Sequence, residues 1–205
     1  FFENLENVRS SFKKFAGNTA DDGILIINND IDDVNYFTEG LKCKVITYSL
    51  KGSCDIYPTD ITYNDKGFAS FVPVFNDNSL ERVSLNVPGD HNVSNALAAI
   101  ALCVQMGISY DCIKAGLKKF CGAHRRFELK GQYKGATVID DYAHHPTEIR
   151  ACLTTAQSYP HKKLWCVFQP HTYTRTAAFL DDFASALSLA DEVILSDIYA
   201  ARETN

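Results

Sequence analysis

The last third of the chain alternates short apolar segments with longer amphipathic ones, and this alternation restricts the possible folds more than any other feature. The apolar segments are ATVIDD (136–141), KLWCVFQP (163–170) and DEVILSDIY (191–199). Between them lie PTEIRACLTTAQ (146–157) and TRTAAFLDDFASALSLA (174–190), whose apolar residues recur at helical spacing. Strands separated by helices predict βαβ units on a parallel sheet. The pattern therefore predicts a Rossmann-like, doubly wound α/β domain.

The earlier part of the chain predicts a mixed α/β domain of a different kind. Four segments rich in β-branched and aromatic residues predict strands: GILIIN (23–28), KVITYSL (44–50), ITYNDKGFASFVPVF (61–75) and ERVSLNVPG (81–89). The third should fold into a hairpin, because NDKG at its centre is a turn sequence. Helical spacing predicts helices over residues 1–16, 92–106 and 109–120, the last with Ser109 as its N-cap.

A stretch with glycines and exposed basic residues, FCGAHRRFELKG (120–131), is the expected hinge between the two domains. We therefore assign residues 1–122 to the first domain and residues 123–205 to the second. The chain opens FFENLENV without an initiator methionine. This start predicts that the sequence is a piece of a longer protein.

Charge and cysteine usage argue against several classes of protein. The net charge is −5 and no run of Lys or Arg exceeds two residues, which argues against nucleic-acid or anionic-membrane partners. No apolar run is long enough to span a membrane, and no signal peptide opens the chain. The seven cysteines never show CxxC spacing, which favours reduced thiols in a cytosol over disulfides or a zinc ribbon. The oligomeric state stays open.

Chemically active side chains follow each predicted strand of the second domain. Asp140 and Asp141 end the first strand, Gln169–His171 the next, and Asp197–Tyr199 the third. In an open parallel sheet, ligands bind beyond the carboxyl ends of the strands, so these groups should meet at one edge. Arg175 lies four residues after His171, close enough to join it at the start of a helix.

The turn VIDDYAHHPTEI (138–149) gathers acids and imidazoles before a helix that Pro146 should begin. His144 and His145 are consecutive, so their side chains diverge, and zinc would need a third ligand and a recognisable spacing. We therefore predict no metal site here. A carboxylate at a strand end suits the hydroxyl groups of a ribose. Capping of the following helix by Asp140 or Asp141 is an equally good explanation.

Two further clusters fit a nucleotide, and each also has a structural explanation. In GDHNVSNALAAIA (89–101), Asn92 and Asn95 share one helix face, and an amide can pair with the edge of adenine. The alternative is helix capping by Asp90 or Asn92. Arg125-Arg126 could bind phosphate oxygens or could simply be solvated. Taken singly, none of these clusters identifies a function.

Taken in order, the motifs resemble the Mur ligase family over essentially the whole chain. They are GDHNVSNALAA, FCGAHRRFELKG, DDYAHHPTEI, FQPHTYTRT and DIYAARE. The resemblance implies a three-domain, ATP-dependent ligase of peptidoglycan precursor synthesis in the bacterial cytoplasm. It implies the substrates UDP-N-acetylmuramate and L-alanine, with ATP and Mg²⁺ as cofactors. The muramyl carboxylate is phosphorylated and the amine of alanine then attacks the acyl phosphate. The chain corresponds to the later part of the central ATPase domain and to the C-terminal domain.

The same resemblance implies roles for individual residues. Asn92 and Asn95 would hold adenine, Asp141 the ribose, and Arg126 the phosphates when the domains close. The alanine and reacting-phosphate side would be lined by His144, His145, His171 and Arg175. Family members often have Arg where this chain has Thr172, so Arg175 is the expected electrostatic contact.

One element of the family pattern does not occur in this sequence. There is no phosphate-binding loop of the form GxxGK[ST]. Its Lys, the Mg²⁺ ligands and the domain for the uridine nucleotide are therefore expected upstream of Phe1, and the chain alone should not catalyse ligation. Three other readings stay open: a murein peptide ligase of cell-wall recycling, a non-catalytic nucleotide-binding module, and a metal-dependent hydrolase built on Asp140, Asp141 and the histidines.

Overall fold

The computed structural model describes residues 4–203, which form two compact units. The first contains the chain up to Thr62 together with Ser70–Leu85 and Asp90–Lys119. The second contains Tyr63–Ala69, Asn86–Gly89 and the chain from Phe120 onward. The domain limits given above, 1–122 and 123–205, remain a proposal. Within the described residues, no helix has both the length and the apolar character needed to cross a membrane.

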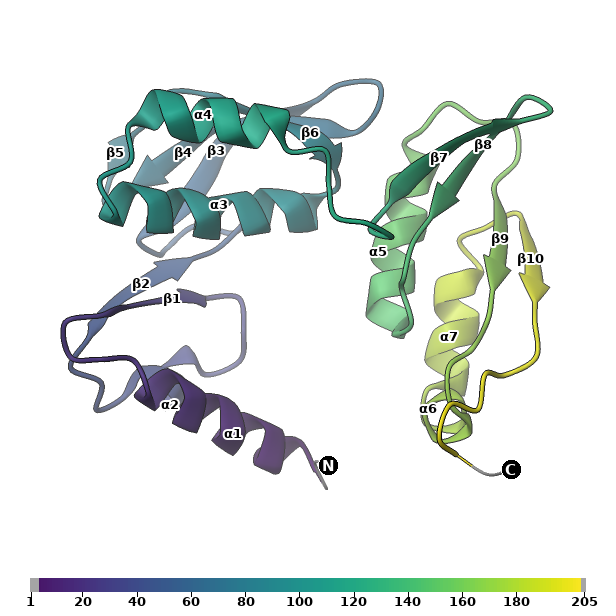
Figure 1. Ribbon diagram of the computed structural model, residues 1–205, viewed down its shortest axis with the longest axis horizontal. Helices are drawn as coiled ribbons and strands as arrows, with labels where there is room; N and C mark the ends of the chain where they lie inside the picture. Colours follow the sequence, from purple (N-terminus) through teal and green to yellow (C-terminus); the bar gives the residue numbers. More distant parts are fainter. Residues whose placement is uncertain (1–3, 204–205) are drawn as a thin grey trace. The chain divides into compact units, whose positions relative to one another are not determined.

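The first unit is built around a six-stranded sheet, which contains all four predicted strand segments. Its strands are β1 (Ile24–Asn28), β2 (Lys44–Tyr48), β3 (Ile56–Tyr63), β4 (Phe68–Phe75), β5 (Asn78–Ser79) and β6 (Val83–Pro88). The order is β1-β2-β3-β4-β5, and β6 also pairs with β4. β1 and β2 run parallel, as do β2 and β3, whereas β4 and β5 are antiparallel. Figure 1 shows β1 and β2 in purple and blue.

The predicted hairpin over residues 61–75 is confirmed as β3 and β4, and Asn64 explains where it turns. The backbone N–H of Gly67 donates to the carbonyl of Asn64 at 2.8 Å, which closes the turn. The side-chain oxygen of Asn64 accepts the N–H groups of Lys66 and Phe68 at 2.9 and 3.0 Å. Gly67 has φ +68°, a conformation that a residue without Cβ adopts at little cost.

Four helices complete the first unit: α1 (Leu5–Gly17), α2 (Val34–Thr38), α3 (Asp90–Gln105) and α4 (Tyr110–Lys119). α3 packs on β1 and β2 with its buried face, which includes Val93, Leu97 and Ile100. α1, α3 and α4 match the predicted helices, although residues 1–3 of the first prediction lie outside the described residues. The short helix α2 was not predicted.

The second unit confirms the predicted α/β class and the alternation of strands and helices (Figure 1). Its elements are β7 (Glu128–Tyr133), β8 (Ala136–Asp140), α5 (Pro146–Gln157), β9 (Trp165–Phe168), α6 (Tyr173–Ala178), α7 (Leu180–Leu187) and β10 (Glu192–Leu195). β9 and β10 are parallel neighbours. α5 and α7 pack against each other.

The structure differs from the prediction in the hinge segment and in the pairing of β8. The segment 120–131 contains the start of a strand, β7, which pairs antiparallel with β8. Tyr133 and Ala136 are directly paired, and both residues between them have positive φ: Lys134 at 49° and Gly135 at 85°. Such a two-residue turn suits the twist of a hairpin, so β8 forms its ladder with β7.

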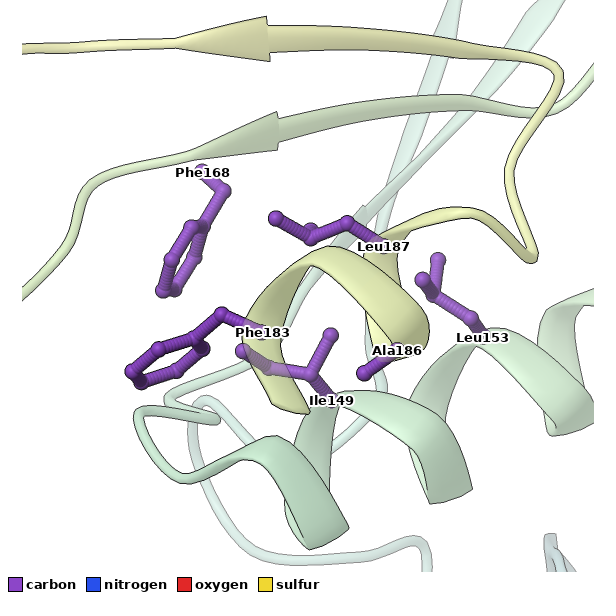
Figure 2. Packing of buried hydrophobic residues seen from close by; sticks show 6 residues of the cluster. All are labelled: Ile149, Leu153, Phe168, Phe183, Ala186 and Leu187. Atoms are coloured by element: carbon purple, nitrogen blue, oxygen red, sulfur yellow. The ribbon is translucent and has the colours of Figure 1, made fainter. Parts of the chain in front are cut away.

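The helix predicted over residues 174–190 is interrupted. Phe179 has φ −122° and ψ 26°, which are not helical values, and it separates α6 from α7. The interruption lets α7 contribute three side chains to the core of this unit. Figure 2 shows this core of six buried residues from α5, β9 and α7, namely Ile149, Leu153, Phe168, Phe183, Ala186 and Leu187.

Candidate active site

The carboxyl ends of β8 and β9 and the loop after β10 surround a pocket of about 390 Å³ in the second unit. Tyr199 is fixed beside β9's end because its N–H donates to the carbonyl of Pro170 at 2.9 Å, while its own carbonyl accepts the N–H of Thr172 at 2.9 Å. The three strand-end groups therefore meet at one pocket, as the sequence predicted. The pocket is lined by Arg125, Asp140, Asp141, Tyr142, Ala143, His144, Val167, Phe168, Gln169, His171 and Tyr199.

Asp141 ties together the two loops that form one wall of this pocket. One carboxylate oxygen accepts the N–H of Phe127 at 2.8 Å, and the other accepts the N–H of Ala143 at 2.7 Å. Phe127 has φ 47°, so the chain needs such a contact to hold it there. A carboxylate has about four acceptor positions, so Asp141 keeps capacity for a ligand hydroxyl.

The two adjacent histidines have different surroundings, which fits their expected divergence. His145 is the N-cap of α5: its Nδ1 accepts the N–H of Thr147 at 3.3 Å, and its ring packs edge-on against Phe179 at 4.9 Å. It is not among the residues that line the pocket. His144 does line the pocket. Its Nδ1 lies 2.9 Å from the carbonyl oxygen of Tyr142 and 3.4 Å from Glu148 Oε2.

Glu148 organises the start of α5. Its Oε2 accepts the N–H groups of His144 and His145 at 3.0 and 3.2 Å, and Arg126 Nη1 lies 3.7 Å from its Oε1. Burial alone would raise the pKa of this carboxyl, but the two N–H donors and the neighbouring His144 and Arg126 outweigh it and hold the pKa below its ordinary value. Glu148 therefore stays ionised as a helix cap.

The two adjacent arginines also separate. Arg125 lines the pocket: its guanidinium lies over the ring of Tyr142 at 4.6 Å, and its Nε is 3.6 Å from Asp140 Oδ2. Arg126, which the family resemblance assigns to phosphates, is next to Glu148 instead. Arg125 has φ 56°, and this turn of the backbone directs the two residues differently. The sequence motif alone did not distinguish them.

His171 and Arg175 share an unusual property. His171 Nδ1 and Arg175 Nη1 are the two buried side-chain polar atoms for which residues 4–203 supply no hydrogen-bond partner. The ring of His171 lies 6.5 Å from that of His144 and 5.4 Å from that of Tyr199. Buried donors without partners are costly, and they are frequent where a ligand completes the hydrogen bonding.

The remaining predicted residues, Asn92 and Asn95, lie in the first turns of α3 in the first unit. Asn95 Nδ2 donates to Asn92 Oδ1 at 3.4 Å, so the two amides are neighbours on one helix face, as their spacing predicted. Asn92 Nδ2 lies 3.1 Å from His91 Nε2. The start of α3 at Asp90, where Gly89 has φ 91°, leaves the capping explanation open for these residues.

The described part of the chain offers no candidate metal-binding site and no candidate reactive thiol. It contains no group of three or more His, Cys, Asp or Glu side chains arranged to hold a metal ion. Cys152 lies behind the pocket wall, where burial first and the charge of Asp141 second raise the pKa of its thiol to about 12. This thiol is therefore protonated at neutral pH and is a poor nucleophile.

Comparison with known proteins assigns the chain to a family. Residues 1–103 match the Mur ligase middle domain, and residues 125–204 match the Mur ligase glutamate ligase domain. The chain belongs to the Mur ligase family. Most of the first unit lies within the first match, and most of the second unit lies within the second.

Relatives within the Mur ligase family are similar over the whole chain. A UDP-N-acetylmuramate–L-alanine ligase from Agathobacter rectalis is 55% identical over 205 residues, which are 100% of this chain and 45% of the relative. The chain thus spans a little under half the length of that relative. The crystal structure of UDP-N-acetylmuramate–alanine ligase MurC from Thermotoga maritima is 30% identical, with a TM-score of 0.77 over 96% of this chain and 42% of that one. A murein peptide ligase from Psychrobacter arcticus is 28% identical, with a TM-score of 0.67 over 95% and 41%.

Proposed function

We propose that the chain is part of an ATP-dependent ligase that joins L-alanine to UDP-N-acetylmuramate during peptidoglycan precursor synthesis in the bacterial cytoplasm. Two lines of support converge on this reaction. The relative that is 55% identical carries the name of this activity. The pocket at the carboxyl ends of β8 and β9 combines two acids, two imidazoles and an arginine in one place.

The observation that carries the proposal is the pair of unpartnered buried nitrogens on His171 and Arg175. An anionic oxygen would satisfy either nitrogen, because a guanidinium donates only and an imidazole Nδ1 donates when it carries the proton. His171 lines the pocket, whereas Arg175 is not among its lining residues. The carboxylate of an amino acid and the oxygens of a phosphoryl group are both suitable. We assign this pair to the amino acid and the reacting phosphoryl group.

ATP is the nucleotide that the residues would hold. Asp141 already accepts two N–H groups and hydrogen-bonds the Cys152 thiol, and a carboxylate with about four acceptor positions still has room for a ribose hydroxyl. Asn92 and Asn95 are assigned to adenine, since their amides both donate and accept. Arg126 is assigned to the phosphates: its ion pair with Glu148 is long at 3.7 Å and half-exposed, so exchanging it for a phosphate costs little.

The chemistry requires activation of a carboxylate, which is a poor electrophile until phosphorylation supplies a leaving group. The amine of alanine then attacks, and cationic donors must stabilise the charge that develops on oxygen. His144 suits the role of proton acceptor. Both acceptors near its Nδ1, the Tyr142 carbonyl and Glu148, favour a proton on that atom and leave Nε2 as a base.

Magnesium belongs to the proposal only through the family. The described residues offer no acid cluster that fits the ion, and the 205-residue sequence has no GxxGK[ST] loop. No step is therefore assigned to the metal here. We expect the 205-residue chain by itself to release no phosphate in response to alanine, because it does not contain the GxxGK[ST] loop that would position the γ-phosphate.

The test uses the complete product of the gene with UDP-N-acetylmuramate and ATP–Mg²⁺. Phosphate release is followed across a panel of single amino acids and a muramyl tripeptide. The proposal predicts the fastest release with L-alanine. Release with the tripeptide alone would move the protein to cell-wall recycling, and nucleotide binding without release under any condition would leave a non-catalytic module.

A further inference from the structure

We propose that the second unit has another ligand site, at the opposite end of strands β8 and β9, which takes a phosphorylated molecule with a flat ring such as a nucleotide. The site, called here the basic recess, is a pocket of about 770 Å³. This volume is in the usual range for small-molecule sites, about 300–1,000 Å³. The recess is lined by Lys134, Gly135, Ala136, Thr137, Ile139, Ala156, Tyr159, Pro160, His161, Lys162, Lys163, Leu164 and Trp165.

The basic recess is distinct from the candidate active site. The first residues of β8 and β9, Ala136 and Trp165, line the recess, whereas their last residues, Asp140 and Phe168, line the other pocket. The two pockets share no lining residue. The proposal therefore does not depend on the function assigned to the other end of the strands.

Positive charge is concentrated in the recess although the chain as a whole carries −5. Lys134, His161, Lys162 and Lys163 line it, and no Asp or Glu does. Lys163 Nζ is paired with Glu192 at 2.5 Å. For Lys134 and Lys162, the described residues supply no carboxylate within ion-pair distance, so neither charge is neutralised by an acid. Lys134 Nζ lies 5.4 Å from the centre of the Tyr133 ring, a contact that leaves its positive charge for an anion.

An aromatic wall adds a second feature that points to the kind of ligand. Trp165 is 57% exposed, although a tryptophan at the start of a strand would normally be covered. Lys163 Nζ lies 5.6 Å from the centre of its ring. Tyr159 contributes a second ring, and its carbonyl oxygen holds His161 Nδ1 at 2.6 Å on the rim.

Lysines beside an exposed aromatic ring suit a ligand that carries both phosphate and a planar ring. Lys ammonium groups bind phosphate as point charges. Stacking of a base on an aromatic side chain strengthens binding by about 10- to 100-fold. A nucleic-acid strand fits less well, because the net charge of the chain is −5 and no run of Lys or Arg exceeds two residues. A mononucleotide therefore matches the recess best.

Trp165 allows the proposal to be tested directly, because it is the single tryptophan of the 205-residue chain. ADP, UDP and tripolyphosphate are each titrated into the complete gene product while tryptophan fluorescence is recorded. The same titrations with Trp165→Phe isolate the part of the signal that comes from Trp165. We expect ADP or UDP to quench this part in a saturable way.

The lysine charges and the aromatic ring of the recess are then removed in separate variants. The double variant Lys134→Ala, Lys162→Ala should bind the nucleotide at least about tenfold more weakly. The control Lys14→Ala, which removes one exposed lysine from α1, should change the nucleotide affinity less than about twofold. Trp165→Ala should weaken binding of the nucleotide but not binding of tripolyphosphate, as measured by calorimetry. Unchanged thermal unfolding of each variant shows that the fold is intact.

Three results would overturn the proposal. The first is the absence of any saturable signal from Trp165 with all three compounds. The second is equal affinity of the double-lysine variant and the parent protein. The third is equal affinity for nucleotide and tripolyphosphate, which would mean a site for anions with no role for the ring.

Discussion

Replacing Asp141 with alanine should destabilise the second unit far more than the same replacement at its neighbour Asp140. Asp141 accepts the N–H groups of Phe127 and Ala143, and the loss of the carboxylate leaves both donors without it. A hydrogen bond to a charged group contributes about 1.5–3 kcal/mol, and both groups here are only part-buried, which favours the lower end. We therefore expect the free energy of unfolding to fall by about 3 kcal/mol.

Asp140 provides a matched control with the same change of charge at the next position. Its carboxylate makes ion pairs with Arg125 and Lys130 at 3.6 and 3.9 Å, and 33% of its side chain is exposed. Partly exposed pairs of this kind contribute about 0–1 kcal/mol. Asp140→Ala should therefore cost less than about 1 kcal/mol.

Hydrogen exchange at individual amides is the most specific assay for this prediction. In Asp141→Ala, the amides of Phe127 and Ala143 should lose protection, and the midpoint of thermal unfolding should fall by roughly 10–20 °C. Asp141→Asn keeps one acceptor oxygen, so its loss of unfolding free energy should lie between those of Asp140→Ala and Asp141→Ala. Equal destabilisation by Asp140→Ala and Asp141→Ala, or unchanged exchange at both amides, would show that the two hydrogen bonds of Asp141 do not stabilise the second unit.

Three other predictions concern pH, packing and catalysis. The pKa of Glu128 is lowered from 4.5 to about 2, chiefly by the backbone N–H of Arg125, so its stabilisation is complete above about pH 4.5 and should disappear as pH falls towards 2. The pKa of Glu148 is also lowered, so its stabilisation should likewise be lost in acid; urea titrations at several pH values check both. Phe183→Ala should cost about 3–5 kcal/mol in the core, whereas Leu180→Ala, at a side chain 62% exposed, should cost less than about 0.5 kcal/mol in the same titration. His171→Ala in the complete gene product should slow alanine-dependent phosphate release roughly 100-fold without changing thermal unfolding, and a rate near that of the parent would exclude a role for the buried Nδ1.

Local turn chemistry explains which strands were predictable from the sequence. The hairpin β3–β4 was predicted because NDKG is a recognisable turn and apolar residues flank it. The first part of β7 lies in the stretch 120–131, whose glycines and basic residues predict a hinge, and ELKGQY has no apolar alternation that would predict a strand. It is a strand because the tight turn at Lys134-Gly135 brings it against β8. The deciding feature is the turn that follows the segment and the pairing with β8, so the residues of β7 by themselves give no strand pattern.

The candidate site also contains residues whose positions the sequence predicted and residues whose roles it did not reveal. A general rule about parallel strands placed Asp140, Asp141 and His171 at one edge, since that outcome depends only on strand direction. The roles of His145 and Arg125 depend on backbone angles. His145 turns inward as a helix cap, and Arg125 reaches the pocket through a left-handed backbone conformation. Spacing in the sequence does not reveal such angles.

The most direct test of the proposed ligase follows one oxygen atom. The complete gene product is supplied with UDP-N-acetylmuramate labelled with ¹⁸O in its carboxylate, together with ATP–Mg²⁺ and L-alanine. If the carboxylate is phosphorylated before alanine attacks, one labelled oxygen leaves with the inorganic phosphate for each amide bond formed. Released phosphate that contains no ¹⁸O, or release that does not depend on L-alanine, would contradict the account.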